Sequence, residues 1–228
     1  MTSNSNRLTK ALVWATLAVI IIVSAIVFFG NREDETSKDI QFESHPNTSG
    51  QPLLGDKNAP VSIVEFGDYK CPACKVWDET IFPQLKAEYI DSNKVNYAYI
   101  NTLFHGEESA LAALASESVW NEHPDSFWAF HKEIFNQQPA SQNHDDAWVT
   151  PEKLIDIAIA ADEEIELEQL ANDMINQTYA DNVIADQELV EEYDITLTPS
   201  IIINGTMLDD PFDYEHIKEV IEEALEEE

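Results

Sequence analysis

The segment Cys71-Pro72-Ala73-Cys74 holds the only two cysteines of this 228-residue chain, and it constrains the fold more than any other feature. The β-branched and aromatic run from Pro60 to Gly67 predicts a central strand that ends four residues before Cys71. Pro72 favours a helix start, because its missing N–H would have no partner there. We therefore expect the pair at the carboxyl edge of a buried strand, with one helical turn bringing the two sulfurs together.

A redox role is the first interpretation of this spacing, since a thiolate can attack a disulfide and a neighbouring thiol can resolve the mixed disulfide. A structural disulfide is the second, although a loop this short gains only about 2 kcal/mol from cross-linking. A zinc site needs about four ligands, and none of the six histidines forms a second pair at ligand spacing. The spacing thus favours redox chemistry, and no metal site is predicted.

The N-terminal region predicts a membrane anchor. Residues 11–30 carry no charge and are long enough to cross a hydrocarbon core of ~30 Å as a helix. Their length and the lack of an A-x-A-like exit favour a retained signal anchor over a cleaved signal peptide. Arg7 and Lys10 precede this segment, which keeps residues 1–10 in the cytoplasm. We expect a single-pass protein of the cell membrane, with a flexible polar tether over residues 31–50 and its catalytic domain on the extracytoplasmic side.

The charge of the exported part excludes one class of partner. Residues 51–228 contain 39 acidic side chains against eight lysines and no arginine. Such a surface repels phosphate backbones, so nucleic acid binding is not expected. Adaptation to a saline or alkaline exterior explains this charge, and a cationic partner or calcium is the alternative. No D-x-D-x-D-G loop is present from which calcium ligands could be named.

Lys70 and Lys75 flank the cysteine pair and are candidates for lowering the pKa of Cys71, since nearby positive charge favours a thiolate. Asp68 and Asp78 lie close by in sequence and would act the other way. Solvation of the surface explains the two lysines equally well, so both interpretations remain open at this stage.

The hydrophobic period changes twice along the rest of the chain. Residues 94–102 predict a second strand, parallel to the first, and residues 105–194 show helical period with few strand signals. Residues 200–208 predict an antiparallel hairpin turning at Asn204-Gly205, and a helix follows from Phe212 to about Leu225. The order indicates an α/β fold with a mixed central sheet flanked by helices, formed by residues 51–104 and 195–228, and an all-helical insertion over 105–194.

An aromatic and aliphatic group within this helical region has two interpretations. It could line an apolar substrate groove or form the core of the insertion, and the core is favoured. Its members are Trp120, Phe127, Trp128, Phe130, Ile134 and Phe135.

The whole arrangement resembles a known family. A cysteine pair after the first core strand, Thr198-Pro199 before the hairpin, and Phe127-Trp128 with His131 are similar to the pattern of DsbA-like thiol:disulfide oxidoreductases of the thioredoxin superfamily. The membrane-anchored BdbD type of Gram-positive bacteria is the nearest match, over about residues 52–225. The resemblance implies a thioredoxin fold and an enzyme whose redox-active disulfide, Cys71–Cys74, works without a cofactor.

The resemblance also implies roles for individual residues. Cys71 would be the exposed nucleophile and Cys74 the buried resolving thiol. Thr198-Pro199 would be a cis peptide whose backbone receives an extended substrate. Glu65 aligns with a buried acid that shuttles a proton for Cys74. The alternative for Glu65 is a side chain that faces solvent on an edge strand.

Pro72 and Ala73 set the identity of the motif. Strong oxidants of the family carry histidine at the position of Ala73, so this chain is expected to be less oxidising than they are.

The leading functional hypothesis is donation of disulfides to unfolded or reduced secreted proteins by a monomer, which a DsbB-like, quinone-linked thiol oxidase of the membrane reoxidises. A reductase or isomerase with the same site is the first alternative. A non-catalytic, membrane-tethered holdase that binds peptides is the second.

Overall fold

The structure is a computed structural model that describes residue 14 and residues 38–139 and 147–226. From Asp39 onwards, the described chain forms one compact unit. The predicted membrane span over residues 11–30 lies, apart from Trp14, outside the described residues. Among the residues that are described, no helix combines the length and the apolar character needed to cross a membrane.

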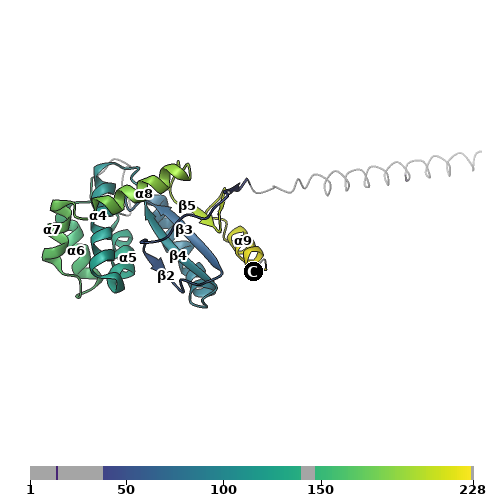
Figure 1. Ribbon diagram of the computed structural model, residues 1–228, viewed down its shortest axis with the longest axis horizontal. Helices are drawn as coiled ribbons and strands as arrows, with labels where there is room; N and C mark the ends of the chain where they lie inside the picture. The colour runs from purple at the N-terminus through teal and green to yellow at the C-terminus, as the bar shows by residue number, and fades with distance from the viewer. Residues whose placement is uncertain (1–13, 15–37, 140–146, 227–228) are drawn as a thin grey trace, which may run out of the picture. The chain divides into compact units, whose positions relative to one another are not determined.

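One mixed sheet organises the unit, with its strands in the order β1-β6-β5-β3-β4-β2 (Figure 1). The strands are β1 (Ile40–Gln41), β2 (Leu53–Leu54), β3 (Val61–Gly67), β4 (Val95–Asn101), β5 (Ser200–Ile203) and β6 (Thr206–Met207). β3 runs parallel to β4 and antiparallel to β5, and six of its seven residues are buried. The predicted central strand, parallel partner and hairpin are confirmed.

The two outer strands were not expected from the sequence. Ile40 in β1 pairs with Met207, and Leu53 in β2 pairs with Ala98. The prediction of a flexible tether up to residue 50 is therefore wrong for the segment around β1. Backbone pairing orders this segment, for example from Phe42 N to the Gly205 carbonyl at 2.9 Å, and a polar sequence without apolar period gives no sign of such pairing.

An interrupted helical connection joins β3 to β4. It consists of α2 (Pro72–Thr80), α3 (Phe82–Leu85) and a π-helical turn (Lys86–Ile90). Pro83 stands in the first turn of α3, where its missing N–H is tolerated, and this accounts for the break between α2 and α3. The last helix, α9 (Tyr214–Glu226), follows the hairpin.

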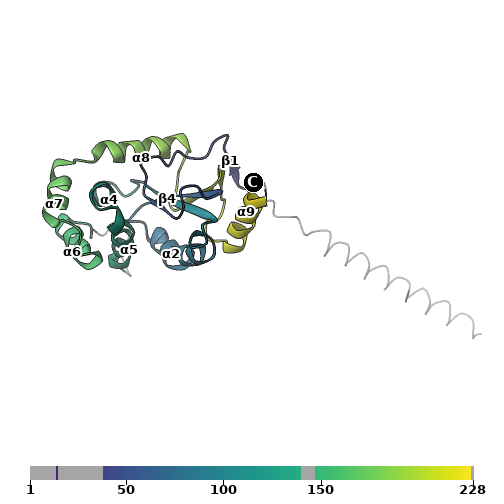
Figure 2. The same cartoon turned by 60° about the horizontal axis from the view of Figure 1, so that its bottom comes forward.

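A helical subdomain is inserted between β4 and β5, as predicted. Its helices are α4 (Glu107–Glu122), α5 (Phe127–Gln137), α6 (Pro151–Ala161), α7 (Leu167–Asn176) and α8 (Ala180–Glu192), with a 3-10 turn (Pro124–Ser126) before α5. Thr150 caps α6 by accepting the Lys153 N–H at 3.2 Å. Figure 2 shows α6 and α7 at the end of the unit away from α9, with α8 leading back to the sheet.

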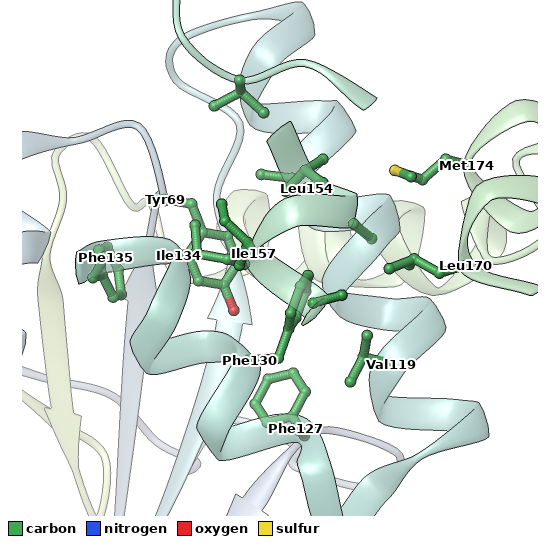
Figure 3. Close-up of a cluster of buried hydrophobic side chains, with 14 of the residues drawn as sticks. Tyr69, Val119, Phe127, Phe130, Ile134, Phe135, Leu154, Ile157, Leu170 and Met174 are labelled. Atoms are coloured by element: carbon green, nitrogen blue, oxygen red, sulfur yellow. The ribbon is translucent and has the colours of Figure 1, made fainter. Parts of the chain in front are cut away.

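The aromatic group of the insertion forms its core. Figure 3 shows Phe127, Phe130, Ile134 and Phe135 packed among Val119, Leu154, Ile157 and Leu170. These side chains are at most 2% exposed, and Trp120 and Trp128 pack against them while partly buried. The prediction that this aromatic and aliphatic group forms the core of the insertion is therefore confirmed. Cys71 and Cys74 belong to the same cluster, which places the reactive pair at the junction of sheet and insertion.

Candidate active site

The cysteine pair lies where β3 gives way to α2. Cys71 is the N-cap residue of α2 and Pro72 stands in its first turn, so the helix presents unpaired N–H groups at this end. The Cys71 side chain is 8% exposed, whereas Cys74 is fully buried. Both are free thiols. Cys71 is thus the more accessible of the two cysteines.

Donors around Cys71 favour its thiolate. A hydrogen bond from the Cys74 thiol is the largest cause that lowers the pKa of Cys71 to about 5, and desolvation works against it. The Thr198 side chain and the backbone N–H groups of Cys74 and Ala73 lower this pKa further. At neutral pH such a group is almost entirely ionised, which is the state that attacks a disulfide.

Cys74 is held in the opposite state. Burial raises the pKa of Cys74 most, and the hydrogen bond to Cys71 and the charges of Cys71 and Glu65 raise it further. The backbone N–H of Asp68 donates to the Cys74 sulfur at 3.4 Å and lowers this pKa. Cys74 therefore needs a proton acceptor before it can act as a nucleophile.

Glu65 lies within β3, in the interior of the sheet, and is 1% exposed. This position overturns the alternative of a solvent-facing glutamate on an edge strand. Tyr97 donates to Glu65 Oε2, while Oε1 has no partner among the described residues. Burial raises the pKa of Glu65 to about 8; the Tyr97 hydrogen bond lowers it, and the charges of Asp78 and Cys71 raise it.

Gly67, at the end of β3, is required by this crowding. A Cβ atom at this position would collide with the Tyr99 ring and approach Glu65 Oε1 to 2.9 Å. The absence of a side chain therefore lets the buried acid, the ring and the loop to Cys71 occupy the same corner of the sheet.

Thr198-Pro199 is a cis peptide and stands immediately before β5. The Thr198 carbonyl oxygen lies 3.4 Å from the Cys71 sulfur and accepts a hydrogen bond from the protonated thiol. A substrate whose cysteine reaches Cys71 therefore arrives next to the backbone of Thr198.

Lys70 and Lys75 flank the cysteines in sequence, but the structure directs their ammonium groups elsewhere. Lys70 is buried and forms an ion pair with Glu108 of α4. Lys75 donates to the Gln138 carbonyl at 2.7 Å. The groups that lower the pKa of Cys71 most are hydrogen-bond donors from the active-site loops, and the two lysines are not among them.

Asp68 has a role that its sequence position does not reveal. Its carboxylate accepts N–H groups of Lys70 at 2.9 Å and Phe104 at 3.0 Å and the Ser109 hydroxyl at 2.9 Å. It also lies 2.7 Å from Nδ1 of His105. Asp68 thereby ties the loop before Cys71 to the loop before α4 and aims its own N–H at Cys74.

Gln138 is a second residue that the sequence analysis did not identify. It follows α5, and its buried side-chain amide donates to the carbonyls of Tyr69 at 2.9 Å and Cys71 at 3.2 Å. The insertion therefore holds the active-site loop directly. A lone glutamine after a helix carries no local signal for such a contact.

No cluster of three or more histidine, cysteine, aspartate or glutamate side chains within residues 38–139 and 147–226 has a geometry that could hold a metal ion. The two sulfurs, the buried carboxyl and the cis-peptide loop can together perform thiol–disulfide exchange with a polypeptide.

Comparison with known proteins agrees with this geometry. A family model described as thioredoxin matches residues 47–223. Disulfide bond formation protein D of Bacillus subtilis is 43% identical over 195 residues, which are 86% of this chain and 86% of that protein. Probable disulfide bond formation protein D of Bacillus anthracis is 34% identical, over 97% of this chain and 98% of that protein. The crystal structure of oxidised BdbD from Bacillus subtilis matches with a TM-score of 0.77, covering 82% of this chain and 98% of that one.

A more distant solved structure shares the fold alone. Chlamydia trachomatis DsbA is 20% identical, with a TM-score of 0.68 over 80% of this chain and 96% of its own. The resemblance inferred from the cysteine pair, the Thr-Pro peptide and the aromatic helix is therefore confirmed. The chain belongs to the thioredoxin family as a homologue of disulfide bond formation protein D, and is a protein-disulfide oxidoreductase of the BdbD/DsbA type with Cys71 and Cys74 as its CxxC pair.

Proposed function

We propose that this chain is a membrane-anchored oxidase that donates disulfides to secreted or cell-surface proteins on the extracytoplasmic side. The observation that carries the proposal is the contrast between the two sulfurs: donors lower the pKa of Cys71 to about 5, and burial raises that of Cys74. A dithiol whose reduced form is stabilised in this way gives up its disulfide readily, so the oxidised pair is a good oxidant. The names of the Bacillus relatives support the same direction.

Donation begins when a substrate thiolate attacks the Cys71 sulfur of the oxidised pair. A mixed disulfide forms as the Cys71–Cys74 bond breaks. Cys74 leaves and takes up a proton, since burial disfavours its thiolate. A second substrate thiolate attacks the mixed disulfide and releases Cys71 as a stabilised thiolate. The substrate has then lost two electrons, which the chain holds as its reduced pair.

Glu65 is the proposed proton carrier for Cys74. It gives a proton to Cys74 when the Cys71–Cys74 bond breaks and takes one from Cys74 when the bond forms again. Burial raises its pKa to about 8, so at neutral pH it still carries a proton to give. Its charge also raises the pKa of Cys74, which means the two groups interact. Thr198 and Pro199 are proposed to hold the substrate backbone beside Cys71, because the Thr198 carbonyl lies within 3.4 Å of that sulfur.

The remaining assignments complete the cycle. A membrane quinone-linked thiol oxidase of the DsbB kind accepts the electrons from the reduced pair and restores the disulfide. The uncharged segment over residues 11–30 anchors the chain, which acts as a monomer outside the cell.

The reduction potential of the Cys71–Cys74 pair, equilibrated with glutathione buffers, tests the direction. We expect a value closer to the ~−120 mV of DsbA than to the ~−270 mV of thioredoxin, and a value near the latter would assign the chain to the reductases instead. The replacement Cys71→Ala separates enzyme from holdase: disulfide formation in secreted proteins should be lost in cells, and full function of this variant would contradict the catalytic assignment.

A further inference from the structure

A cavity beside the active-site loops lies outside the groups assigned to catalysis. Its volume is about 450 Å³, and its lining includes Phe104, Val190, Glu191, Asp194, Ile195 and Thr196. We propose that it binds the side chain of a lysine or arginine in the polypeptide whose cysteine reacts with Cys71. This proposal rests on the proposed function only in taking Cys71 as the sulfur that bonds to the substrate.

The cavity is lined by the end of α8, by the segment that follows this helix as far as Thr196, and by Phe104. Thr196 stands two residues before Thr198, whose carbonyl is 3.4 Å from the Cys71 sulfur. The Phe104 N–H donates to Asp68 at 3.0 Å, and the Asp68 N–H donates to the Cys74 sulfur at 3.4 Å. Thr196 is therefore connected to the Cys71 sulfur through a short stretch of backbone, and Phe104 is connected to the Cys74 sulfur through Asp68.

The lining matches the two parts of a basic side chain. Phe104, Val190 and Ile195 provide an apolar wall for the aliphatic stem, and Phe104 is 42% exposed, so its ring is available to a ligand. Glu191 and Asp194 provide carboxylates for the cationic head. An aromatic face adjoining two carboxylates favours a cation over an acidic or purely apolar group, which would leave both charges without compensation.

The two carboxylates are available for this purpose. Glu191 and Asp194 are exposed, and neither forms an ion pair with any residue in the described part of the chain. Glu191 lies in the last turn of α8, Asp194 follows the end of that helix, and both line the same cavity. The strongly acidic composition of residues 51–228 adds a field that attracts basic segments.

The position of the cavity sets the position of the basic residue in the substrate. Residues two apart in an extended chain point to the same side and lie roughly 7 Å from each other. A substrate cysteine at Cys71 lies next to Thr198, and Thr196 at the cavity is two residues away along the same segment. The test therefore places the basic side chain two residues from the reacting cysteine.

The test measures attack by Cys71 on peptides that differ at this position alone. Each extended peptide carries one cysteine as a mixed disulfide with thionitrobenzoate, and arginine, citrulline or glutamate two residues away on both sides. In the Cys74→Ser protein, the Cys71 thiolate attacks the peptide sulfur. The Cys71–peptide disulfide forms, the peptide–thionitrobenzoate bond breaks, and thionitrobenzoate leaves with the electron pair, so its absorbance reports the second-order rate constant.

We expect the arginine peptide to react about 10-fold faster than its uncharged citrulline isostere, and the glutamate peptide to react slowest. Adding Glu191→Gln and Asp194→Asn together should reduce the arginine preference to less than about 2-fold. Asparagine suits position 194, because Asp194 has a φ of 51° and asparagine tolerates this left-handed conformation. The control is Glu192→Gln, which removes an exposed acid that is next to Glu191 in sequence but absent from the lining, and it should leave the preference unchanged.

Two results would overturn the proposal: equal rates for the arginine and citrulline peptides, or a preference that falls equally in the pocket variant and the Glu192→Gln control. The second result would assign the preference to the overall field of the protein. Titration of the Cys71 thiolate in every variant shows that its reactivity is unaltered. The reduction potential decides whether the chain is an oxidase or a reductase, whereas the rate constants with these peptides are the same in either case. A failure of the cavity proposal therefore leaves the proposed oxidase function standing, and the reverse also holds.

Discussion

Two buried acidic residues, Asp68 and Glu65, interact with Cys74, and the surroundings of their carboxyl groups differ. Asp68, in the loop after β3, is surrounded by donors from its own loop and from the loop before α4. Glu65, three residues earlier within β3, has Tyr97 as its donor and keeps Oε1 without a partner among the described residues. Both side chains are about 1% exposed, so burial alone does not distinguish them.

The difference lies in how completely each carboxyl group is hydrogen-bonded. A carboxylate that accepts several fixed donors holds those donors in place. A buried carboxyl group with one free oxygen can take up or release a proton at small structural cost. Two acids of similar depth can therefore serve different purposes, Asp68 as a tie between loops and Glu65 as the proposed proton carrier for Cys74.

The largest expected effect is the loss of stability on replacing Asp68 with alanine. Its buried donors would lose their acceptor, and breaking such a network costs about 3–5 kcal/mol. Urea denaturation of the reduced protein measures the free energy of unfolding. Asp125→Ala removes an exposed aspartate and should change it by less than about 0.5 kcal/mol. A decrease of under about 1 kcal/mol in the free energy of unfolding of Asp68→Ala would contradict the proposal that Asp68 holds the two loops together.

The replacement Glu65→Gln should retain the fold and slow thiol–disulfide exchange by about 100-fold, because Cys74 would lose its proton carrier. Stopped-flow measurement of the exchange with a reduced peptide gives the rate as a function of pH. The wild-type profile should show a limb near pH 8, where Glu65 ionises, and the variant should lack that limb. Wild-type rates in the variant would remove the distinction between the two acids.

The same variant tests the pKa of Glu65 through stability. Burial raises the pKa of Glu65 from 4.5 to about 8, so its contribution to stability is complete below pH 4.5 and is lost as the pH rises through 8. Relative to the wild type, Glu65→Gln should thus gain stability as the pH rises, by roughly 4 kcal/mol between pH 5 and pH 9. Urea denaturation at pH 5 and pH 9 compares the two proteins, and a difference that is the same at both pH values would exclude the raised pKa.

The smallest expected effect concerns the cations beside the pair. Replacing Lys70 and Lys75 together with glutamine should leave the pKa of Cys71 near 5, since the lysines are engaged by Glu108 and the Gln138 carbonyl. Thiolate absorbance measures this pKa. Thr198→Val serves as the positive control and should raise it, because it removes a hydrogen-bonding side chain. A clear rise in the lysine variant would restore the lysines as the groups that tune Cys71.

Local sequence signals identified much of the fold. The run before Cys71 predicted β3 and Asn204-Gly205 predicted the hairpin, since each depends on side-chain pattern or backbone preference within a few residues. The edge strand β1 was missed because its order comes from pairing with β6, across more than 160 residues.

The sequence by itself determined the chemistry of this protein: two cysteines at redox spacing after a buried strand admit few other uses. Tertiary structure decided which groups control that chemistry. Asp68 and Gln138 contact the active-site loop through hydrogen bonds that no local pattern encodes. Lys70 and Lys75 are next to the cysteines in sequence, but their ammonium groups bind other partners. The physical reason is that a pKa depends on the burial and the donors supplied by the whole fold, whereas spacing along the chain fixes only which sulfurs can meet.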